Sequence, residues 1–366
     1  MEGTTTKKPK YKKDGGDFQE LRKRTASLVK KLEKKKAWLI KFKAIFFPLL
    51  YIGTYFFLLK FGENPYFFYS TYFFLGVFLV LNFLNLIHDA VHDVIFKSPK
   101  WLNNLYVHFF DLLGANSYIW RIRHIRLHHA FPNVMNWDTD FEQSPMAKVF
   151  PQAESKQVHR YQHLYLPFLY PLYLFNWLLV RDFKDFFKKD TIVQREVRIP
   201  LKEYLKLFLF KGFFFGYIII LPKYILQVSW GAVIGGFILM VLTASLLSLL
   251  VLLSPHANVY SEFPQPDEKG NMPYSWFEHQ LQCTNDISND NFFIRFFMGC
   301  FNFHIAHHLF PDIHHIYYPE VTVLIEDYTK EHHLPYRKQS LFRSLAGHYS
   351  LLKKNAFQEN IFEETM

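Results

Sequence analysis

The chain has 366 residues, of which 50% are hydrophobic and 19% are aromatic. Two uncharged runs, residues 65–87 and 224–254, exceed the roughly 20 apolar residues that cross a bilayer as a helix, which excludes an ordinary soluble domain. The formal net charge of +10 arises within residues 1–43, where 15 Lys and Arg face 5 Asp and Glu. Beside a membrane helix, such a segment favours contact with anionic lipid, so we expect no nucleic-acid partner.

The N-terminal quarter of the sequence predicts a basic tail followed by a membrane hairpin. Residues 1–43 form the predicted cytoplasmic tail, which includes a helix from Thr25 to Lys36 at the membrane surface. Residues 44–87 form the first transmembrane hairpin, with spans at Ala44–Leu59 and Pro65–Ile87. Lysines that flank the first span are expected to anchor it at the bilayer surface.

A second transmembrane hairpin is predicted at residues 204–254, with spans at Tyr204–Leu226 and Gly231–Leu253. Residues 88–203 and 255–366 are then the two parts of a helical cap. An even number of crossings returns the chain to its starting side of the membrane. Both termini and the cap are therefore expected on the cytoplasmic side, where basic segments usually lie.

The stretch Leu164–Val180 is 17 residues long and uncharged, yet we predict that it does not cross the membrane. It contains Pro167 and Pro171, and a crossing would place the histidine clusters described next on opposite faces. We expect an interfacial helix instead. The predicted fold is an all-α integral membrane protein of about four transmembrane helices in two hairpins, with a cytoplasmic helical cap that holds a di-metal site.

Three short clusters of histidine, called here the histidine boxes, predict that metal site. They are His88 with His92, then His124, His128 and His129, then His304, His307 and His308. Helix positions three and four apart share a face, so the imidazoles of one box are expected to point the same way. Eight imidazoles exceed the capacity of one ion and fit two. A ninth ligand is expected at His256, which follows the fourth span as His88 follows the second.

Other polar residues near the boxes are candidates for orienting the ligands by binding the free imidazole N–H. They are Asp89, Asp93, Asp138, Asp140 and His279. For each carboxylate the alternative is a solvated charge or a helix cap, and for His279 it is direct ligation. His314 and His315 are expected at the local surface or beside the ligands. The remaining histidines are expected to play no part in the site.

Arginines and cysteines leave two further expectations. Arg121, Arg123 and Arg126 interleave with the second box and are candidates either for binding a phosphate-bearing head group or for simple interfacial anchoring. Cys283 and Cys300 match no metal or redox motif and are expected to be free thiols.

With these boxes, the chain resembles the membrane fatty acid desaturase and hydroxylase superfamily. The pattern is His-x3-His, His-x3-His-His and His-x2-His-His, and the resemblance extends from about Phe46 to Tyr318. Within it, the chain looks most like front-end acyl-lipid or acyl-CoA desaturases. The residues that carry this closer resemblance are the stretch Gly114 to Trp120, the pair Asp138 and Asp140, and His307-His308-Leu-Phe-Pro311.

Two features depart from the front-end pattern. His304 stands where front-end members usually have Gln, which leaves the position of the attacked bond open. The sequence also lacks the His-Pro-Gly-Gly haem motif of the cytochrome-b5-like domain that many members carry. Electrons are therefore expected from a separate protein, either a ferredoxin or a cytochrome-b5-like protein.

The resemblance implies two iron ions, dioxygen and a fatty acyl substrate carried by coenzyme A or by a membrane lipid. Breaking an unactivated C–H bond requires a strong metal-bound oxidant, and the protein positions and shields the acyl chain, here in an expected apolar tunnel. A hydroxylase of the same superfamily fits the same ligands. A histidine-rich metal transporter or sensor fits less well, because transporters usually place ionisable residues within their spans.

Overall fold

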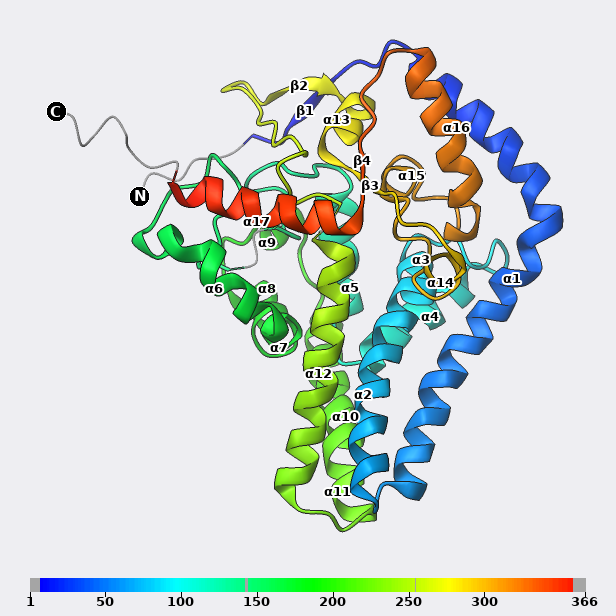
Figure 1. The fold of residues 1–366 in the computed structure, drawn as a ribbon, viewed down its shortest axis with the longest axis vertical. Helices are drawn as coiled ribbons and strands as arrows, with labels where there is room; N and C mark the ends of the chain where they lie inside the picture. The colour runs from blue at the N-terminus through cyan, green and yellow to red at the C-terminus, as the bar shows by residue number, and fades with distance from the viewer. Residues whose placement is uncertain (1–6, 142–143, 254, 358–366) are drawn as a thin grey trace.

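The computed structural model describes residues 7–141, 144–253 and 255–357, which form a bundle of long helices with a cap at one end (Figure 1). The bundle contains α1 (Asp17–Phe61), α2 (Pro65–Asn82), α10 (Leu201–Phe215) and α12 (Trp230–Leu252). The short elements η1 (Phe83–Ile87) and α3 (His88–Val91) extend α2, while η6 (Gly216–Ile220) and α11 (Leu221–Ile225) extend α10.

Local sequence signals begin the bundle helices, and small residues let them pack closely. The side chain of Asn64 accepts a hydrogen bond from the amide of Tyr66 and begins α2, and Ser229 caps α12 in the same way. A Cβ added to Gly76 of α2 would lie 2.4 Å from the Met240 carbonyl oxygen of α12. Only a residue without a side chain permits this approach between the two hairpins.

The helix α1 differs from the prediction because it runs unbroken for 45 residues. The sequence predicted a surface helix and a separate span, but Lys and Leu favour helix, and no breaker lies between the two parts. The N-terminal half of α1 packs on α16 (Tyr318–Glu331) in the cap, where Lys36 donates a hydrogen bond to Glu320 over 2.6 Å. The predicted tail is thus, from Lys7 onward, part of the folded structure.

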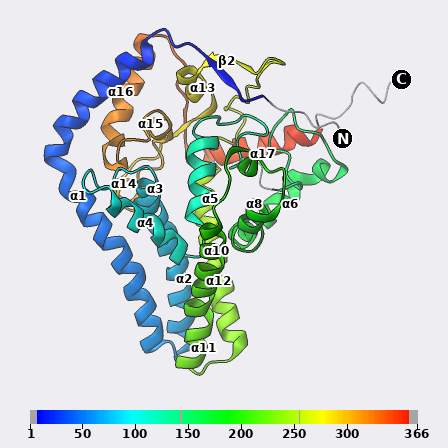
Figure 2. The same ribbon diagram turned by 180° about the vertical axis from the view of Figure 1, so that it is seen from behind.

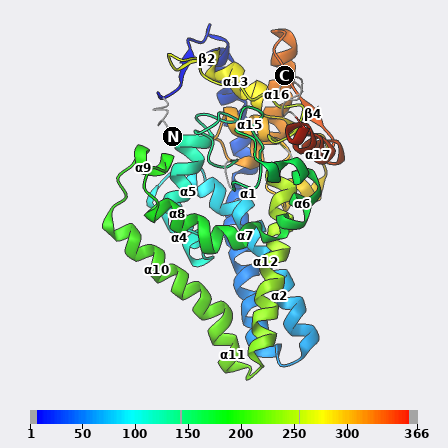
Figure 3. The ribbon, with the colours of Figure 1, turned by 90° about the vertical axis from the view of Figure 1, so that its left-hand side faces the viewer.

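Within the described residues, five helices are long and apolar enough to cross a membrane, one more than the number of crossings that the sequence predicted. The fifth is residues 157–187, called here the arm, which includes Leu164–Val180. Around its two prolines the arm breaks into short pieces: η3 (Gln157–Tyr161), α6 (Gln162–Leu169), η4 (Tyr170–Leu172), α7 (Tyr173–Asn176), η5 (Trp177–Arg181) and α8 (Asp182–Phe187). The arm lies across the cap end of α12 instead of along the bundle (Figure 1, Figure 3).

The cap is built from short helices contributed by both halves of the chain. Its first part comprises α4 (Trp101–Leu112), α5 (Ser117–Arg121), η2 (Ile122–His128) and α9 (Ile192–Glu196). Its second part comprises α13 (Trp276–Cys283), α14 (Phe292–Phe296), α15 (His304–Leu309), η7 (His315–Tyr317), α16 and α17 (Leu341–Phe357). The helices α4 and α5 lie where the bundle meets the cap (Figure 2).

In the part of the chain that the structure describes, two small parallel strand pairs add to the helices that the sequence predicted. β1 (Lys10–Lys12) pairs with β2 (Asn271–Ser275), and β3 (Asp286–Ile287) pairs with β4 (Lys338–Gln339). Each pair joins segments that are far apart in the sequence, so local pattern gives no signal for them. The first pair fastens the N-terminal segment to the cap.

Candidate metal centre

Among the described residues, eight of the nine predicted ligands form two clusters of four imidazoles. Within each cluster, one nitrogen atom from every histidine lies within 4.8 Å of the others. The first cluster contains His88, His92, His124 and His307, and the second contains His128, His256, His304 and His308. His129 groups with His307 and His308, and it therefore lies between the two clusters.

The clusters do not correspond to the histidine boxes, because two boxes are each divided between them. His124 and His128 lie four residues apart on η2, a π-helix, and their rings stack with centroids 5.7 Å apart, yet His124 groups with the first cluster and His128 with the second. His307 and His308 are adjacent on α15, so their side chains leave the helix about 100° apart. Each cluster consequently takes ligands from both halves of the chain.

The distances between nitrogen atoms suit coordination of metal ions. The Nε2 atoms of His88 and His124 are 3.1 Å apart, and that of His256 is 2.9 Å from those of His304 and His308. A metal–nitrogen distance of about 2.1 Å puts two ligands at a right angle about 3 Å apart.

Two buried nitrogen atoms of the first cluster strengthen this fit. The Nε2 atoms of His92 and His307 have no hydrogen-bond partner among the described residues. Buried polar atoms are normally paired, so both are suited to a metal ligand role. The all-imidazole donor sets therefore fit two transition-metal ions, one in each cluster.

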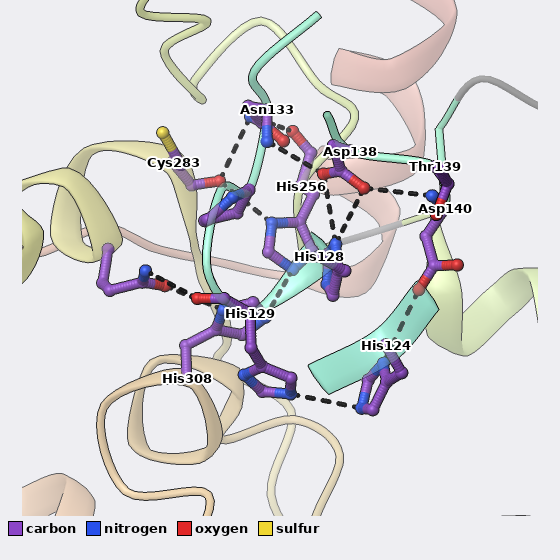
Figure 4. Close-up of polar contacts among 12 residues, drawn as sticks. His124, His128, His129, Asn133, Asp138, Thr139, Asp140, His256, Cys283 and His308 are labelled. Atoms are coloured by element: carbon purple, nitrogen blue, oxygen red, sulfur yellow. Dashed lines mark hydrogen bonds and ion pairs between the residues drawn. The ribbon is translucent and has the colours of Figure 1, made fainter. Parts of the chain in front are cut away.

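Hydrogen bonds from the cap fix the orientation of three of the four imidazoles in the second cluster (Figure 4). The Nδ1 atom of His128 lies 3.0 Å from Oδ1 of Asp138, which is fully buried. The Nδ1–H of His256 donates to the carbonyl oxygen of Cys283, and that of His308 donates to the side-chain oxygen of Gln280. With Nδ1 engaged, each ring presents Nε2 to the cluster.

In the first cluster, Asp140 lies beside a predicted ligand. One of its carboxylate oxygens is 3.6 Å from Nδ1 of His124, and the other is 3.5 Å from the Arg181 guanidinium. The indole of Trp120 stacks on His124 with a centroid separation of 4.6 Å. His307 has its Nδ1 atom 3.3 Å from the hydroxyl of Tyr318.

Burial favours the neutral form of most of these imidazoles, and metal ligation requires that form. Burial lowers the pKa of seven of them: His92, His124, His129, His256, His304, His307 and His308. Burial also acts to lower the pKa of His128, but the charge and the hydrogen bond of Asp138 outweigh it and raise that pKa. Asp138 thus makes His128 more basic than those seven imidazoles.

Two predicted orienting residues have other partners in the structure. Asp93 forms an ion pair with Arg121 over 2.6 Å at the surface of the cap. His279 is fully buried, and its Nε2–H donates to the carbonyl oxygen of Pro132, 2.8 Å away. His279 supports the loop after the second box and belongs to neither cluster.

Asp89 lies at the centre of a buried polar group that the sequence did not reveal. Its carboxylate contacts Nδ1 of His315 and lies 3.2 Å from Nε2 of His314, while Nζ of Lys43 is 2.8 Å from Nε2 of His315. The two histidines are buried, not at the surface as one reading allowed. This group ties α3 to α1 and to the start of η7, beside the first cluster.

Both cysteines are buried free thiols, as the sequence predicted.

Comparison with known proteins identifies the family. A family model described as fatty acid desaturase matches residues 64–340, about three quarters of the chain. The chain belongs to the fatty acid desaturase family. It is an integral membrane oxidoreductase that acts on lipids, and it carries histidine clusters that fit a metal site.

Curated relatives of this desaturase agree with the family assignment. The sn-1 linoleoyl-lipid 6-desaturase of Arthrospira platensis is 30% identical over 74% of this chain and 73% of its own length. The enzyme of the same name from Synechocystis is 28% identical over 76% of this chain and 78% of its own length. The acyl-lipid (8-3)-desaturase of Physcomitrium patens is 30% identical over 74% of this chain and 57% of its own length.

A cavity of about 360 Å³, called here the acyl cavity, leads to the histidines of the desaturase. Apolar side chains of the arm and of α12 line most of it, including Leu166, Leu169 and Leu252. At its polar end it reaches predicted ligands from both clusters, His124 and His256 among them. The volume lies within the usual range for small-molecule sites. The sequence predicted an apolar tunnel but could not name the residues that line it, because the arm reaches the cavity only through the tertiary fold.

Proposed function

We propose that this desaturase holds two iron ions in its two clusters and introduces a double bond into a fatty acyl chain. The reaction removes two hydrogen atoms from neighbouring carbons, and two electrons and two protons from a donor complete the reduction of dioxygen to two waters. The observation that carries the proposal is that two buried all-imidazole clusters adjoin one apolar cavity. When bound, the irons supply the oxidising power for C–H cleavage.

The protein's own residues bind the acyl chain and exclude water. The leucines of the arm and of α12 hold the chain by burying its apolar surface, at roughly 25 cal/mol for each Å² removed from water. Asp138, Gln280 and the Cys283 carbonyl hold the imidazoles in place, so the site is organised before the substrate binds.

The proposed membrane placement follows from the exposed surface. Phe168 of the arm is 81% exposed and Leu164 is 53% exposed, which suits an amphipathic segment lying in the bilayer surface. We place four crossings in the bundle and put the cap, both termini and the site on the cytoplasmic side. The electron donor, a ferredoxin or a cytochrome-b5-like protein, would then reach the site from the cytoplasm.

The names of the relatives suggest the form of the substrate. Two relatives are named as acting on a linoleoyl lipid at position 6, and a third is named as an acyl-lipid desaturase. We therefore favour an acyl chain esterified to a membrane lipid, attacked near its carboxyl end. His304, which departs from the front-end pattern, lies in the second cluster and faces His256 as a ligand would.

Expression in a host that lacks polyunsaturated lipids, followed by mass spectrometry of its fatty acids, tests the proposal. A new double bond is expected with the wild-type chain. It is expected to disappear in His308→Asn and to persist in His333→Asn, whose altered side chain is exposed on the cap. A new hydroxyl group without a new double bond would replace desaturation by hydroxylation, and unchanged lipids would refute both.

A further inference from the structure

We infer that a basic pocket beside the acyl cavity binds the phosphate of the acyl carrier, an inference that rests on the proposed function. This pocket, called here the basic pocket, has a volume of about 540 Å³ and is formed by η5, α8, α9 and the loops that face them. Ser144 and Asn176 line both the basic pocket and the acyl cavity. The two spaces are therefore adjacent, one apolar and one charged, as the two ends of an acyl carrier require.

Positive charge predominates in the basic pocket. Its lining contains five basic side chains and two acidic ones: Arg181, Lys184, Lys188, Lys189 and Arg195 against Asp185 and Asp190. Asp185 is already engaged by Arg123 over 2.9 Å. Within the described parts of the chain, none of the three lysines forms an ion pair. The pocket thus keeps a net positive charge for an anionic ligand.

Arg181 distinguishes this pocket from an ordinary basic surface. The residue is only 6% exposed, and its guanidinium lies over the ring of Trp177, 5.2 Å from the centroid. One terminal nitrogen donates to the Thr139 carbonyl, but the other, Nη1, has no partner among the described residues. A buried guanidinium nitrogen without an acceptor is costly, and a phosphate oxygen is the acceptor that its geometry suits.

A single carboxylate connects the basic pocket with the proposed metal site. Asp140 lies 3.5 Å from Arg181 and 3.6 Å from Nδ1 of His124. A phosphate bound at Arg181 would therefore lie close to the first cluster. The carbons that pass the irons would belong to the carboxyl end of the acyl chain.

Two of the three arginines that the sequence offered for this task are already used elsewhere, while the third, Arg126, is exposed and does not line the basic pocket. Arg121 pairs with Asp93, and Arg123 is buried between Asp182 and Asp185. These contacts neutralise both side chains. The structure assigns the head group to the arm, about sixty residues farther along the chain.

The test uses the purified full-length enzyme with its iron, an electron donor, and one linoleoyl chain on three carriers. Phosphatidylcholine and coenzyme A carry phosphate, whereas monogalactosyl diacylglycerol does not. In the double variant Lys184→Gln/Lys188→Gln, we expect KM for a phosphate carrier to rise roughly tenfold with kcat little changed, because a charge-assisted contact is lost from binding alone. The galactolipid should be used poorly by every variant.

One control variant and one further test variant make the result specific. Lys330→Gln removes an exposed lysine from α16, on the other side of the cap, and should leave KM unchanged (Figure 1). Arg181→Lys keeps the charge but loses the planar fork, and should also raise KM. Iron content should equal that of the wild type in all variants.

Each outcome is decisive. A response confined to phosphatidylcholine or to acyl-coenzyme A identifies which phosphate carrier the pocket takes. If the lysine substitutions leave KM unchanged, or if the galactolipid is used as well as the phosphate carriers, phosphate binding in the basic pocket is refuted while desaturation still stands. If an iron-loaded enzyme turns over no carrier, both the proposed function and this inference fail.

Discussion

Replacing Asp138 by Asn should weaken metal binding without unfolding the protein. The carboxylate is fully buried and accepts hydrogen bonds from the amides of Asn133 and Asp140, at 2.9 and 3.1 Å, besides its contact with His128. An Asn side chain has the same size, but one of its two oxygens becomes an NH2 group. That group cannot accept the imidazole N–H or the backbone N–H that it faces.

The magnitude follows from the partner that is lost. Replacing the hydrogen-bond partner of a ligating histidine usually costs about 10–100-fold in metal affinity. At 1.36 kcal/mol for each factor of ten, this is about 1.4–2.7 kcal/mol. The loss should fall on the ion held by His128, so about one of the two proposed irons should leave first.

Iron content after dialysis against increasing chelator measures this effect, and the thermal unfolding of the metal-free protein reports on folding. The control is Asp327→Asn, which changes the same atoms on the exposed side of α16. We expect the Asp138 variant to lose iron at about 10–100-fold lower chelator concentration. Iron retention equal to that of the wild type across the whole range would refute the role given to Asp138.

Three further changes test the packing, the cavity and a titrating group. Gly76→Ala should destabilise the contact between the hairpins by about 1–3 kcal/mol, because its Cβ would meet a carbonyl oxygen of α12. The control, Gly53→Ala, faces open space. Chemical unfolding in detergent compares the two variants, and equal stabilities would contradict the close packing at Gly76. Leu166→Trp should block the acyl cavity and abolish activity with metal content unchanged, while Leu164→Trp, on the exposed face, should remain active. Mass spectrometry of the fatty acids made by each variant checks this, and equal activities would contradict the role of Leu166. Burial raises the pKa of Asp286 from 3.8 to about 7, so the stability that the protonated carboxyl contributes is complete below pH 3.8 and is lost as pH rises through about 7. Asp286→Asn should flatten this part of the curve of unfolding temperature against pH, and a slope that persists in the variant would contradict the raised pKa of Asp286.

The histidines that the sequence proposed as metal ligands lie together in the structure, and local spacing accounts for part of this. Histidines four apart on one helix, such as His88 and His92, stay together wherever the helix goes. How the boxes divide between the two clusters was not predictable. That division depends on which neighbouring rings each histidine meets in the folded cap, as with His307 and His308, whose side chains leave α15 in different directions.

Contacts between distant segments account for what the sequence missed. Asp89 meets His315 across more than two hundred residues, and Gln280 reaches His308 from a separate helix. No periodic pattern encodes such pairs. The length of α1 was missed for a different reason: its lysines suggested a basic tail at the membrane surface, whereas the long apolar stems of Lys also suit a helix lying on the cap.

The division of ligands between the clusters also sets an order of events during synthesis. When translation has passed His256, the first cluster still lacks His307, and the second still lacks His304 and His308. Neither cluster can be complete until α15 has left the ribosome and packed into the cap. Metal loading would therefore be a late step in biogenesis, and a chain truncated before α15 could not acquire either complete centre.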